Sequence, residues 1–516
     1  MEHSYQKILQ QRSEVHPHRI ALIFEGKKIT YRHLHDSANN VAAWLLNAKI
    51  NKGDRVAFLD YNNDDYIHLL NGCLIIGVIP VSINWRSTRA EINYILQNAG
   101  CRLFFYGHNF TKTAETVNAI AAIKSFEIPG IIKHINQQKY EAQELPEINQ
   151  DEPAILIYTS GTTGNPKGVL LSNKNIYAMY LSLRNETPLF GPASVNLIAG
   201  PWYSVVGVGY FIFGIYTGCT NVTLKYFDPI EICRLIQQYK ITNAFFAPVM
   251  MKVICALDEI NDFDLSSLQN IQYGGSPIDE TQLRICYNTF KCNFTQGYGL
   301  TETSGIATVL RFDDHKKTLS GNDDAPLHIL HSAGKPYAGI EIKIVDENLN
   351  TVSPGNTGEV CLKGDVVALG YWNSAGEGDK LFNKDGWLLT GDIGYLDQEG
   401  YLFLIDRKHD LIISKAINIF PTEIETILNG HPQIKECAII GIPHDIYGET
   451  ICAVVVIENG EIQLNELRSW AKDKMAEYKL PTELKLVTEL PRNPAGKILR
   501  KQLRELFWER HTRRIN

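Results

Sequence analysis

The chain has 516 residues, of which 44% are hydrophobic, and a formal net charge of -7. A chain of this length is too long to fold around one hydrophobic core. We expect one large multi-layer domain and a smaller domain. The acidic balance argues against a nucleic-acid partner, and the ten cysteines, none in a Cys-x-x-Cys pair, indicate neither a zinc site nor a disulfide framework.

The first residues do not read as a signal peptide. Residues 1–7 lack the basic and apolar regions of a signal peptide, and no apolar run approaches the length of a membrane span. Scattered cysteines fit a reducing compartment. We therefore expect a cytoplasmic protein without a transmembrane segment.

Short β-branched runs alternate with amphipathic stretches along the N-terminal part of the chain. Residues 56–59 and 78–83 read as buried strands, a helical pattern surrounds Leu70, and another covers residues 90–97. This alternation is typical of parallel sheets covered by helices.

A loop rich in glycine and hydroxyl side chains follows the apolar run at residues 154–157. Residues 158–168 read Tyr-Thr-Ser-Gly-Thr-Thr-Gly-Asn-Pro-Lys-Gly. Glycines let backbone N–H groups approach an anion, hydroxyls donate hydrogen bonds, and the lysine adds a compact positive charge. The spacing differs from a Walker A loop, and a plain surface turn would explain only part of the string. The loop predicts a triphosphate site formed by Thr159, Ser160, Gly161, Thr162, Thr163, Gly164 and Lys167.

This loop resembles the signature loop of the adenylate-forming superfamily, which includes acyl-CoA synthetases, peptide-synthetase adenylation domains and luciferases. Further similarity runs from residues 29–31 through 53–57 to 491–497, so nearly the whole chain is covered. The resemblance implies an α/β fold with a large N-terminal domain of parallel sheets covered by helices, a β-barrel-like subdomain, and a small mobile C-terminal α+β domain.

The C-terminal part of the chain fits this organisation. From about Gly339 the pattern changes to β-rich segments at 341–345 and 358–362, which predict the barrel-like subdomain. A charged connection at 406–410 precedes apolar runs that predict a small separate sheet. We place the domains at residues 1–406 and 407–516.

Two glycine-rich turns are expected to meet the nucleotide. Residues 273–277, Tyr-Gly-Gly-Ser-Pro, form a turn that can lie against a flat ring, although alone they would read as an ordinary β-turn. In residues 296–302 an aromatic ring is flanked by glycines, and Glu302 supplies the single carboxylate that Mg²⁺ needs beside substrate phosphates. By resemblance, Tyr298 stacks on adenine, Thr301 contacts the α-phosphate and Glu302 holds Mg²⁺. The resemblance adds Gly274, Gly275, Ser276, Gly297 and Gly299 to the nucleotide site.

Three residues of the C-terminal half complete the predicted site. Asp392 follows a glycine turn, where a carboxylate can accept hydrogen bonds from two ribose hydroxyls, and the resemblance implies that role. It also implies that Arg407 meets the ribose or phosphate, that His409 is the pivot of a hinge, and that Lys497 stabilises charge at the attacked phosphorus and the carboxylate. Taken singly, Arg407 and Lys497 would read as solvated surface residues, and only the joint match favours the site.

The chain departs from the family pattern at two places. Ser204 stands where histidine is common, so no gating histidine is transferred. The loop at Ser414, Lys415 and Ala416, expected on the coenzyme A side, replaces the Ser-Gly-Gly of many acyl-CoA synthetases. The alanine leaves adenylation better supported than thioester formation. The helix start at 421–425 has the spacing of a capping box.

The acyl pocket is predicted to be apolar and to lack a basic residue for a second carboxylate. Its predicted lining is Tyr203, Ser204, Val208 and Tyr273. The leading hypothesis is an ATP-dependent acyl-CoA ligase that converts an apolar monocarboxylic acid into an acyl-adenylate with Mg·ATP and transfers the acyl group to coenzyme A. The alternative is a stand-alone adenylating ligase that acylates an amine or a carrier protein. A catalytically silent nucleotide-binding protein is a third reading, and the joint presence of the predicted site residues argues against it. A homodimer stays open as the assembly.

Overall fold

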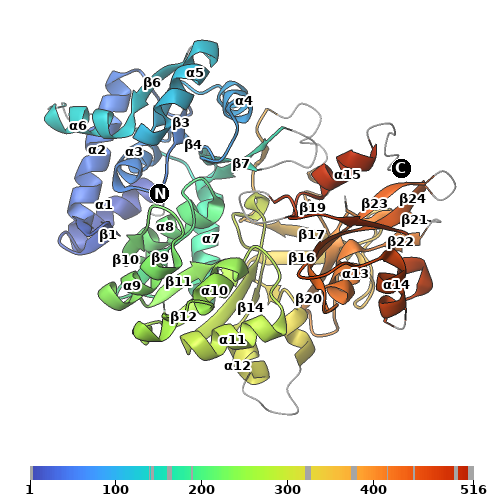
Figure 1. The fold of residues 1–516 in the computed structure, drawn as a ribbon. Coiled ribbons are helices and arrows are strands. Elements are labelled where there is room, and N and C mark those ends of the chain that lie inside the picture. The colour runs from blue at the N-terminus through green and yellow to red at the C-terminus, as the bar shows by residue number, and fades with distance from the viewer. Residues whose placement is uncertain are drawn as a thin grey trace. The chain divides into compact units, whose positions relative to one another are not determined.

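The computed structural model describes residues 4–121, 123–138, 140, 144–159, 165–187, 190–319, 327–373, 381–408, 410–414, 417–444, 448–472, 474–492 and 498–508 (Figure 1). The chain forms two compact units. The first comprises Met1–Ile342 and Leu362–Leu389, and the second comprises Lys343–Cys361 and Thr390–Asn516. This division differs from the predicted boundary after residue 406, which stays a prediction.

The first unit contains a seven-stranded sheet with helices on both faces. Its strand order is β18-β8-β7-β4-β3-β5-β6. The strands are β3 (Arg55–Leu59), β4 (Ile79–Ser82), β5 (Leu103–Tyr106), β6 (Lys124–Glu127), β7 (Pro153–Thr159), β8 (Lys167–Ser172) and β18 (Gly370–Tyr371). The neighbouring helices are α2 (Tyr31–Asn47), α3 (Asp64–Ile75), α4 (Arg89–Ala99), η1 (His108–Phe110), α5 (Thr111–Ala121) and α6 (Ile128–Gln137).

Strand alternation decides which helices cover which face of this sheet. Ala57 and Leu59 belong to a buried cluster with residues of α4 and α5. Phe58, between them, points to the opposite face, where its ring centroid lies 4.9 Å from that of Tyr66 in α3. The sheet is therefore buried on both sides, as its nearly uninterrupted apolar strands require.

A second sheet of the first unit has nine strands, in the order β15-β14-β13-β12-β11-β9-β10-β1-β2. The strands are β1 (Ile20–Phe24), β2 (Lys27–Thr30), β9 (Val195–Ile198), β10 (Thr220–Thr223), β11 (Asn243–Phe246), β12 (Asn270–Gly274), β13 (Asn293–Tyr298), β14 (Thr308–Leu310) and β15 (Lys335–Pro336). The helices are α1 (Tyr5–Val15), α7 (Asn173–Glu186), α8 (Val205–Thr217), α9 (Pro229–Tyr239), α10 (Pro248–Cys255), η2 (Ile260–Asp262), α11 (Glu280–Phe290), η3 (Thr301–Thr303), α12 (Phe312–Leu319) and η4 (Leu327–His331).

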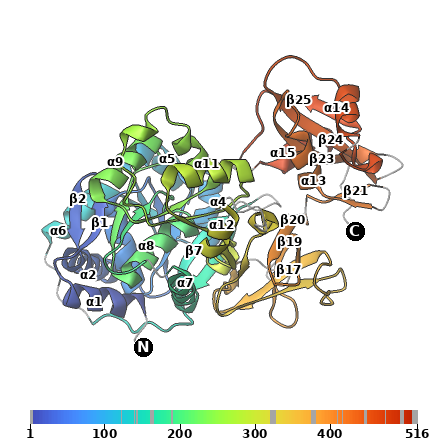
Figure 2. The same ribbon diagram turned by 90° about the horizontal axis from the view of Figure 1, so that it is seen from below.

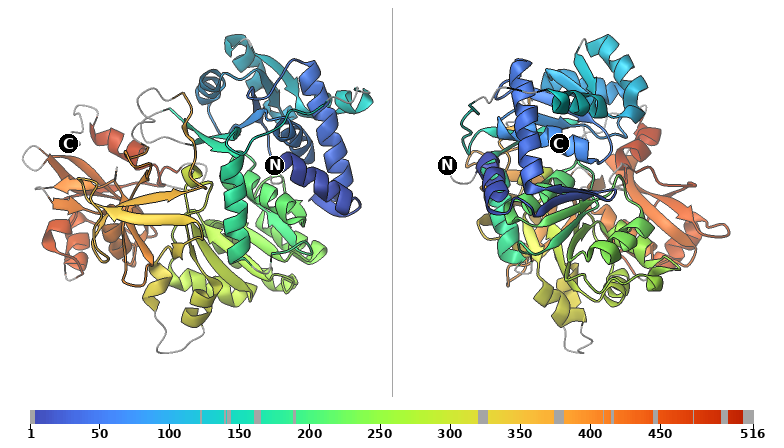
Figure 3. Two further views of the ribbon diagram at one scale, coloured as in Figure 1. Left: turned by 180° about the vertical axis from the view of Figure 1, so that it is seen from behind. Right: turned by 90° about the vertical axis from the view of Figure 1, so that its left-hand side faces the viewer.

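The two faces of this second sheet are covered by different helices. Tyr210 of α8 contacts Gln272 of β12 on one face. Phe290 of α11 packs against Phe246 and Phe294 on the other face. The N-terminal helices α1 and α2, drawn in blue, pack against each other in both views of Figure 3.

The β-rich segment predicted after Gly339 is a four-stranded sheet. Its strands are β16 (Ile340–Val345), β17 (Gly358–Gly364), β19 (Leu388–Leu396) and β20 (Leu402–Arg407), in the order β16-β17-β19-β20. Over the described residues this order is that of an open sheet, where the sequence suggested a barrel-like subdomain.

The remaining C-terminal part is a small α+β fold (Figure 2). Its strands are β21 (Ile412–Ser414), β22 (Ile417–Ile419), β23 (Ile434–His444), β24 (Gly448–Ile457) and β25 (Glu483–Leu486), and its helices are α13 (Pro421–Leu428), α14 (Leu464–Ala471), η6 (Glu477–Lys479) and α15 (Arg500–Trp508). Alternate residues of β23 face two separate cores. Ile439 packs with α13 and α14, whereas Ile440 packs with α15.

The start of α13 differs from its sequence pattern. Pro421 is the first helical residue, Phe420 is the N-cap, and no side chain of the helix caps its first turn. Instead the Asp406 carboxylate accepts a hydrogen bond from the Thr422 N–H at 2.9 Å. The predicted capping box is therefore wrong, because a carboxylate from β20 already satisfies the exposed amide.

Three further findings concern groups that bear on function. No helix in the described part of the chain is long and apolar enough to cross a membrane. No three His, Cys, Asp or Glu side chains among the described residues are grouped so that they could hold a metal ion. All ten cysteines are free thiols.

Candidate functional site

The two ends of the predicted phosphate loop are fixed by a β-hairpin. Thr159, the last residue of β7, pairs with Lys167, the first residue of β8. The Thr159 hydroxyl also donates to the Lys167 carbonyl at 3.5 Å. The loop residues themselves lie outside the described residues, namely Ser160, Gly161, Thr162, Thr163 and Gly164. The hairpin thus holds Lys167 at the base of the loop.

Two glycines at the ends of β12 and β13 bring bare backbone to the surface of the sheet. Gly274 and Gly297 are partners across the parallel ladder. A Cβ added at Gly274 would lie 2.3 Å from the Gly297 carbonyl oxygen, so only glycine fits there. Gly275 follows with a φ of +86°, and Ser276 is exposed beside it. This is the carboxyl edge of parallel strands, where open α/β sheets bind ligands.

The predicted metal ligand lies on a tight turn after β13. Gly299 permits the turn, because a Cβ there would be 2.5 Å from the Gly305 backbone. The chain returns antiparallel, and the Ala307 N–H donates to the Tyr298 carbonyl at 2.7 Å. Thr301 and Glu302 follow in η3, where both are partly exposed.

The Glu302 carboxylate accepts a hydrogen bond from a residue of the same unit. The hydroxyl of Tyr371 donates to Glu302 Oε1 at 2.7 Å. An ionised carboxylate offers about four lone-pair sites, so oxygen acceptor capacity remains for a hard cation. Because Mg²⁺ takes one or two carboxylates together with substrate phosphates, Glu302 fits the ion that the family pattern implies.

Sequence reasoning did not select Tyr371, although it contacts two predicted site residues. Besides its bond to Glu302, its ring lies 5.2 Å, centroid to Nζ, from the Lys167 ammonium. Tyr371 reaches this place because β18 pairs with β8. The Gly-Tyr-Trp string at 370–372 gave no local signal for this pairing.

The predicted ribose residues form an ion pair in the second unit. Asp392 of β19 and Arg407 of β20 are cross-strand partners, and Arg407 Nε lies 2.6 Å from Asp392 Oδ1. The Asp392 side chain is 8% exposed, whereas that of Arg407 is 41% exposed. The arginine thus stays accessible to a phosphate or ribose, and the buried carboxylate is neutralised by it.

The predicted acyl-pocket residues fall into different environments. Ser204 is the N-cap of α8, where its hydroxyl accepts from the Gly207 N–H at 3.1 Å and donates to the Pro201 carbonyl at 2.9 Å. Tyr203, just before the helix, is half-buried, and burial raises the pKa of its phenol. Val208 lines a small apolar cavity between α7, α8, β7 and β8.

Tyr273 does not share the face of β12 that α8 covers. Its hydroxyl contacts His315 Nε2 at 2.8 Å, and its ring packs on Phe294. Burial lowers the pKa of His315 to about 4, so the imidazole is neutral at neutral pH.

Gln272, the neighbour of Tyr273, faces α8 instead. Its Oε1 accepts from the Tyr210 hydroxyl, and its Nε2 donates to the Tyr337 hydroxyl at 3.1 Å. A Cβ on Gly297 would lie 3.2 Å from Gln272 Nε2. This buried amide therefore lies beside Gly297, because alternation along β12 places Gln272 on the opposite face from Tyr273.

The structure describes only part of the predicted hinge, the coenzyme A side loop and the loop of Lys497. His409, Lys415, Ala416 and Lys497 lie outside the described residues. Ser414 is the last residue of β21 and pairs with Gly448 of β24. The loop that carries Lys497 is closed at its base, because the Leu499 N–H donates to the Pro491 carbonyl at 2.7 Å.

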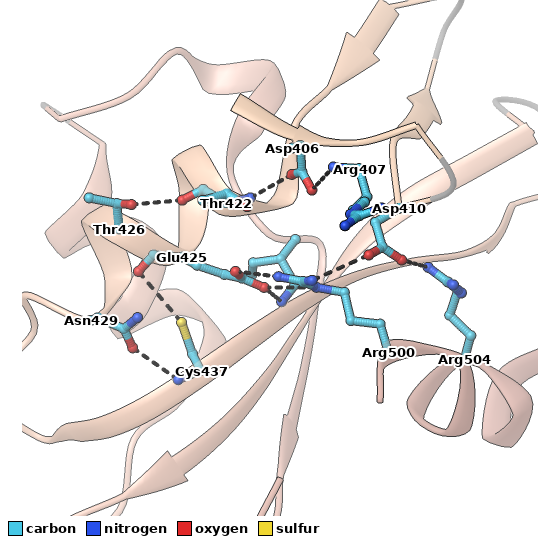
Figure 4. Close-up of polar contacts among 11 residues, drawn as sticks. Asp406, Arg407, Asp410, Thr422, Glu425, Thr426, Asn429, Cys437, Arg500 and Arg504 are labelled. Atoms are coloured by element: carbon cyan, nitrogen blue, oxygen red, sulfur yellow. Dashed lines mark hydrogen bonds and ion pairs between the residues drawn. The ribbon is translucent and has the colours of Figure 1, made fainter. Parts of the chain in front are cut away.

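A network of charges holds the helix that follows Lys497. Arg500 Nη2 lies 2.6 Å from Glu425 Oε2, and Arg500 Nη1 lies 3.3 Å from Asp410 Oδ2. Arg504 adds a second contact to Asp410 at 3.0 Å (Figure 4). All four side chains are less than one-fifth exposed. The network therefore joins α15 to α13 and to the segment beside His409.

Comparison with known proteins identifies the family. The AMP-binding enzyme family matches residues 9–372, and the AMP-binding enzyme C-terminal domain matches residues 423–497. The chain belongs to the AMP-binding enzyme family. As a member of that family it is an AMP-forming acyl ligase, which confirms the resemblance drawn from its motifs.

The similar proteins cover the chain almost from end to end. A fatty acid–[acyl-carrier-protein] ligase of Streptomyces coeruleorubidus is 33% identical over 503 residues, which are 96% of this chain and 95% of the relative. A feruloyl-CoA synthase of an Amycolatopsis species is 31% identical over 499 residues, with 96% and 97% covered.

A solved structure agrees with the fold of this AMP-binding enzyme. The o-succinylbenzoate CoA synthetase of Bacillus subtilis, in complex with its acyl-adenylate intermediate, matches with a TM-score of 0.85 and 29% identity. The match covers 96% of this chain and 97% of that one. The same synthetase has also been solved with ATP and a magnesium ion, again with a TM-score of 0.85. The predicted α/β fold class is confirmed.

Proposed function

We propose that this enzyme activates an apolar monocarboxylic acid with Mg·ATP, forming an acyl-adenylate and pyrophosphate, and then transfers the acyl group to coenzyme A. The observation that carries the proposal is the contact of Tyr371 with both Glu302 and Lys167. It joins a candidate Mg²⁺ ligand to the lysine at the base of a phosphate-type loop. Family membership supplies the reaction class.

The remaining residues take the roles that the family pattern suggests. In the first unit, Thr301 contacts the α-phosphate, Tyr298 stacks on adenine, and Gly274 and Gly297 present backbone to the nucleotide. When bound, Mg²⁺ neutralises charge on the phosphates. The phosphate loop contributes hydroxyl and N–H donors. Its residues are Thr159, Ser160, Gly161, Thr162, Thr163 and Gly164.

The second unit contributes the ribose contacts and the catalytic lysine. Asp392 binds the ribose hydroxyls, Arg407 meets the ribose or phosphate, and Lys497 stabilises the charge that develops at the attacked phosphorus. We place the small mobile domain at residues 407–516, with His409 at the pivot. A homodimeric state and a cytoplasmic location also stay predictions.

The lining of α8 supports an apolar acid. Val205–Thr217 contains no charged residue. Two polar groups beside this helix, Gln272 and Tyr337, are buried and hydrogen-bonded to each other. Within α8 itself a second carboxylate would find no cation, and its desolvation would cost several kcal/mol. A monocarboxylic acid with an aliphatic or aromatic body therefore fits best.

A carrier protein is the second candidate for the acceptor. It is favoured by the 33% identity to a fatty acid–[acyl-carrier-protein] ligase and by Ala416 in a loop where glycine is usual on the coenzyme A side. Coenzyme A remains the leading acceptor, as the names of the feruloyl-CoA and o-succinylbenzoate CoA enzymes suggest.

A substrate screen tests the proposal. The full-length enzyme is mixed with Mg·ATP and a panel of carboxylic acids, and pyrophosphate release is measured. Products are then identified by mass spectrometry after addition of coenzyme A or an acyl-carrier protein. We expect pyrophosphate release with apolar monocarboxylic acids and an acyl-CoA product. Preference for a dicarboxylic or charged amino acid would overturn the substrate class, and acylation of the carrier alone would overturn the acceptor.

A further inference from the structure

One phenol contacts two residues of the proposed nucleotide site. The Tyr371 hydroxyl donates to Glu302 Oε1 at 2.7 Å, and the Lys167 ammonium lies over the same ring, 5.2 Å from its centroid. The three residues come from β18, η3 and the first position of β8. Glu302 and Tyr371 are 69 residues apart in the sequence, so tertiary structure alone brings them together.

The backbone around Tyr371 is held on both sides. Tyr371 pairs with Val169 of β8, and two main-chain bonds flank this pair. The Leu369 N–H donates to the Leu170 carbonyl at 2.9 Å, and the Trp372 N–H donates to the Gly168 carbonyl at 2.7 Å. On the other side, the Ala368 N–H donates to the Glu302 carbonyl at 2.8 Å. The phenol is therefore supported by the same two elements that carry Glu302 and Lys167.

The hydroxyl and the ring can act separately. A hydrogen bond to one carboxylate oxygen fixes the orientation of Glu302 and leaves lone pairs for a cation, and such outer contacts strongly affect metal affinity. Mg²⁺ demands near-ideal octahedral geometry, so orientation matters more for it than for a larger ion. The π face attracts the ammonium of Lys167 and limits its side-chain freedom.

We propose that Tyr371 is a positioning residue for adenylation, with its hydroxyl orienting Glu302 toward Mg²⁺ and its ring holding Lys167 for the nucleotide phosphates. This inference rests on the proposed function, in which Glu302 holds the metal. Tyr371 itself transfers no proton and forms no bond to the substrate.

Two substitutions separate the tasks of the side chain. Tyr371→Phe removes the hydroxyl and keeps the ring, whereas Tyr371→Leu removes both. Tyr395→Phe is the matched control, because Tyr395 is also partly buried but stacks on Phe403 in the four-stranded sheet, with ring centroids 5.0 Å apart. Thermal unfolding of each full-length variant verifies that it is folded.

The first measurement is binding without turnover. Electron paramagnetic resonance measures the binding of Mn²⁺ to the enzyme. The titration contains α,β-methylene-ATP and no carboxylic acid. The same nucleotide is titrated by calorimetry in excess EDTA. We expect Tyr371→Phe to weaken Mn²⁺ binding about tenfold or more and to leave metal-free nucleotide binding unchanged. Tyr371→Leu should weaken both, and Tyr395→Phe neither.

The second measurement is steady-state pyrophosphate release. For Tyr371→Phe, the Mg²⁺ concentration at half-maximal rate should rise about tenfold, while excess Mg²⁺ restores kcat. A merely structural role would lower kcat without this rescue. A fall in kcat that Mg²⁺ does not restore, or unchanged Mn²⁺ binding, would overturn the inference.

Glu302→Gln distinguishes failure of the inference from failure of the proposed function. If Glu302→Gln weakens Mn²⁺ binding and Tyr371→Phe does not, only the role of Tyr371 is lost. If Glu302→Gln leaves Mn²⁺ binding unchanged, the metal role of Glu302 is lost and the inference falls with it. The double variant should bind Mn²⁺ no more weakly than Glu302→Gln alone, because both changes act through one carboxylate. Additive losses would show that Tyr371 acts elsewhere.

Discussion

At the scale of single residues, burial decides what several polar side chains do. Ser204 occupies the position of a family histidine, but its hydroxyl caps α8. Near the start of α3, Asp64 forms an ion pair with Lys27, whereas its neighbour Asp65 is partly buried beside it. Adjacent carboxylates thus experience different electrostatic environments, and this difference can be measured.

We expect Asp65→Asn to stabilise the enzyme at neutral pH. Burial, and then the charge of Asp64, raise the pKa of Asp65 to about 6. A carboxyl with a raised folded-state pKa adds stability that is complete below about pH 4 and is lost as the pH rises through about 6. Asparagine cannot ionise, so the variant should gain about 1 kcal/mol above about pH 6, allowing for solvent screening, and nothing near pH 4.

Thermal unfolding midpoints at these two pH values measure the effect. Asp64→Asn is the matched control, because it removes a carboxylate that pairs with Lys27 and should not stabilise the fold. A lower midpoint for Asp65→Asn at neutral pH would contradict the prediction.

Ala416→Gly should speed acyl transfer to coenzyme A. If the second step places this loop against the pantetheine chain at φ > 0, alanine adds strain on the order of 1 kcal/mol, and its methyl group adds more. Relief of both corresponds to a gain of roughly tenfold in the transfer rate. Acyl-CoA formation measures the gain, and pyrophosphate release, which should not change, is the internal control. A glycine variant that is no faster would remove the main sequence support for a carrier acceptor.

At the scale of elements, α15 is attached to the small fold by charge as well as by apolar packing. Leu503 lies in the core beneath the helix, and Arg500 faces Glu425 and Asp410. Burial raises the pKa of Glu425, and the Arg500 guanidinium opposes that rise. A buried carboxylate without a charge partner lowers the free energy of unfolding. Arg500 is therefore needed to offset the burial of Glu425 and Asp410.

Arg500→Met should strongly destabilise the small domain. It leaves Glu425 without its guanidinium partner, a change that costs about 3–5 kcal/mol for a buried pair. Since α15 begins three residues after Lys497, adenylation should fall too. Lys501→Met is the control on the same helix, because its contact with Glu505 is exposed, at 4.0 Å, and such pairs contribute about 0–1 kcal/mol.

Limited proteolysis and thermal unfolding of the two variants measure the difference. Rapid cleavage within residues 407–516 is expected for Arg500→Met only. Equal behaviour of Arg500→Met and Lys501→Met would mean that the apolar contacts of α15 are sufficient.

At the scale of the whole molecule, the candidate residues are divided between two units. Glu302 and Lys167 belong to the first, and Asp392, Arg407 and Lys497 to the second. The proposed reaction needs contributions from both. A hinge at residue 409 would let the contribution of Lys497 change between the half-reactions, as hinged domains commonly do.

Lys497→Ala should therefore affect the two half-reactions differently. We expect it to abolish acyl-adenylate formation, measured by pyrophosphate release, because in the proposed mechanism the lysine stabilises charge at the attacked phosphorus. Conversion of supplied acyl-adenylate to acyl-CoA should remain largely intact, since the proposed rotation removes Lys497 from the site. Equal loss of both steps would contradict the proposed rotation.

Local patterns and motifs were sufficient to predict several elements and the family. The apolar run at 154–157 lies within β7, the strand predicted at 56–59 lies within β3, and the helix predicted at 90–97 lies within α4. The two strands are short apolar runs that are buried on both faces, and the helix repeats its apolar residues on one face, so both kinds of segment can be recognised locally. The motifs also selected Gly274 and Gly299 as site residues. The structure shows why glycine is needed there, because a Cβ would clash with backbone atoms at both positions.

Tertiary structure decided the contacts between distant segments. Sheet pairing brings Tyr371 to Glu302, alternation along β12 turns Gln272 toward α8 and Tyr273 away, and a carboxylate from β20 replaces the expected cap of α13. No local pattern encodes these outcomes. Each depends on which strand lies beside which, and that is settled by packing of the sheets as a whole.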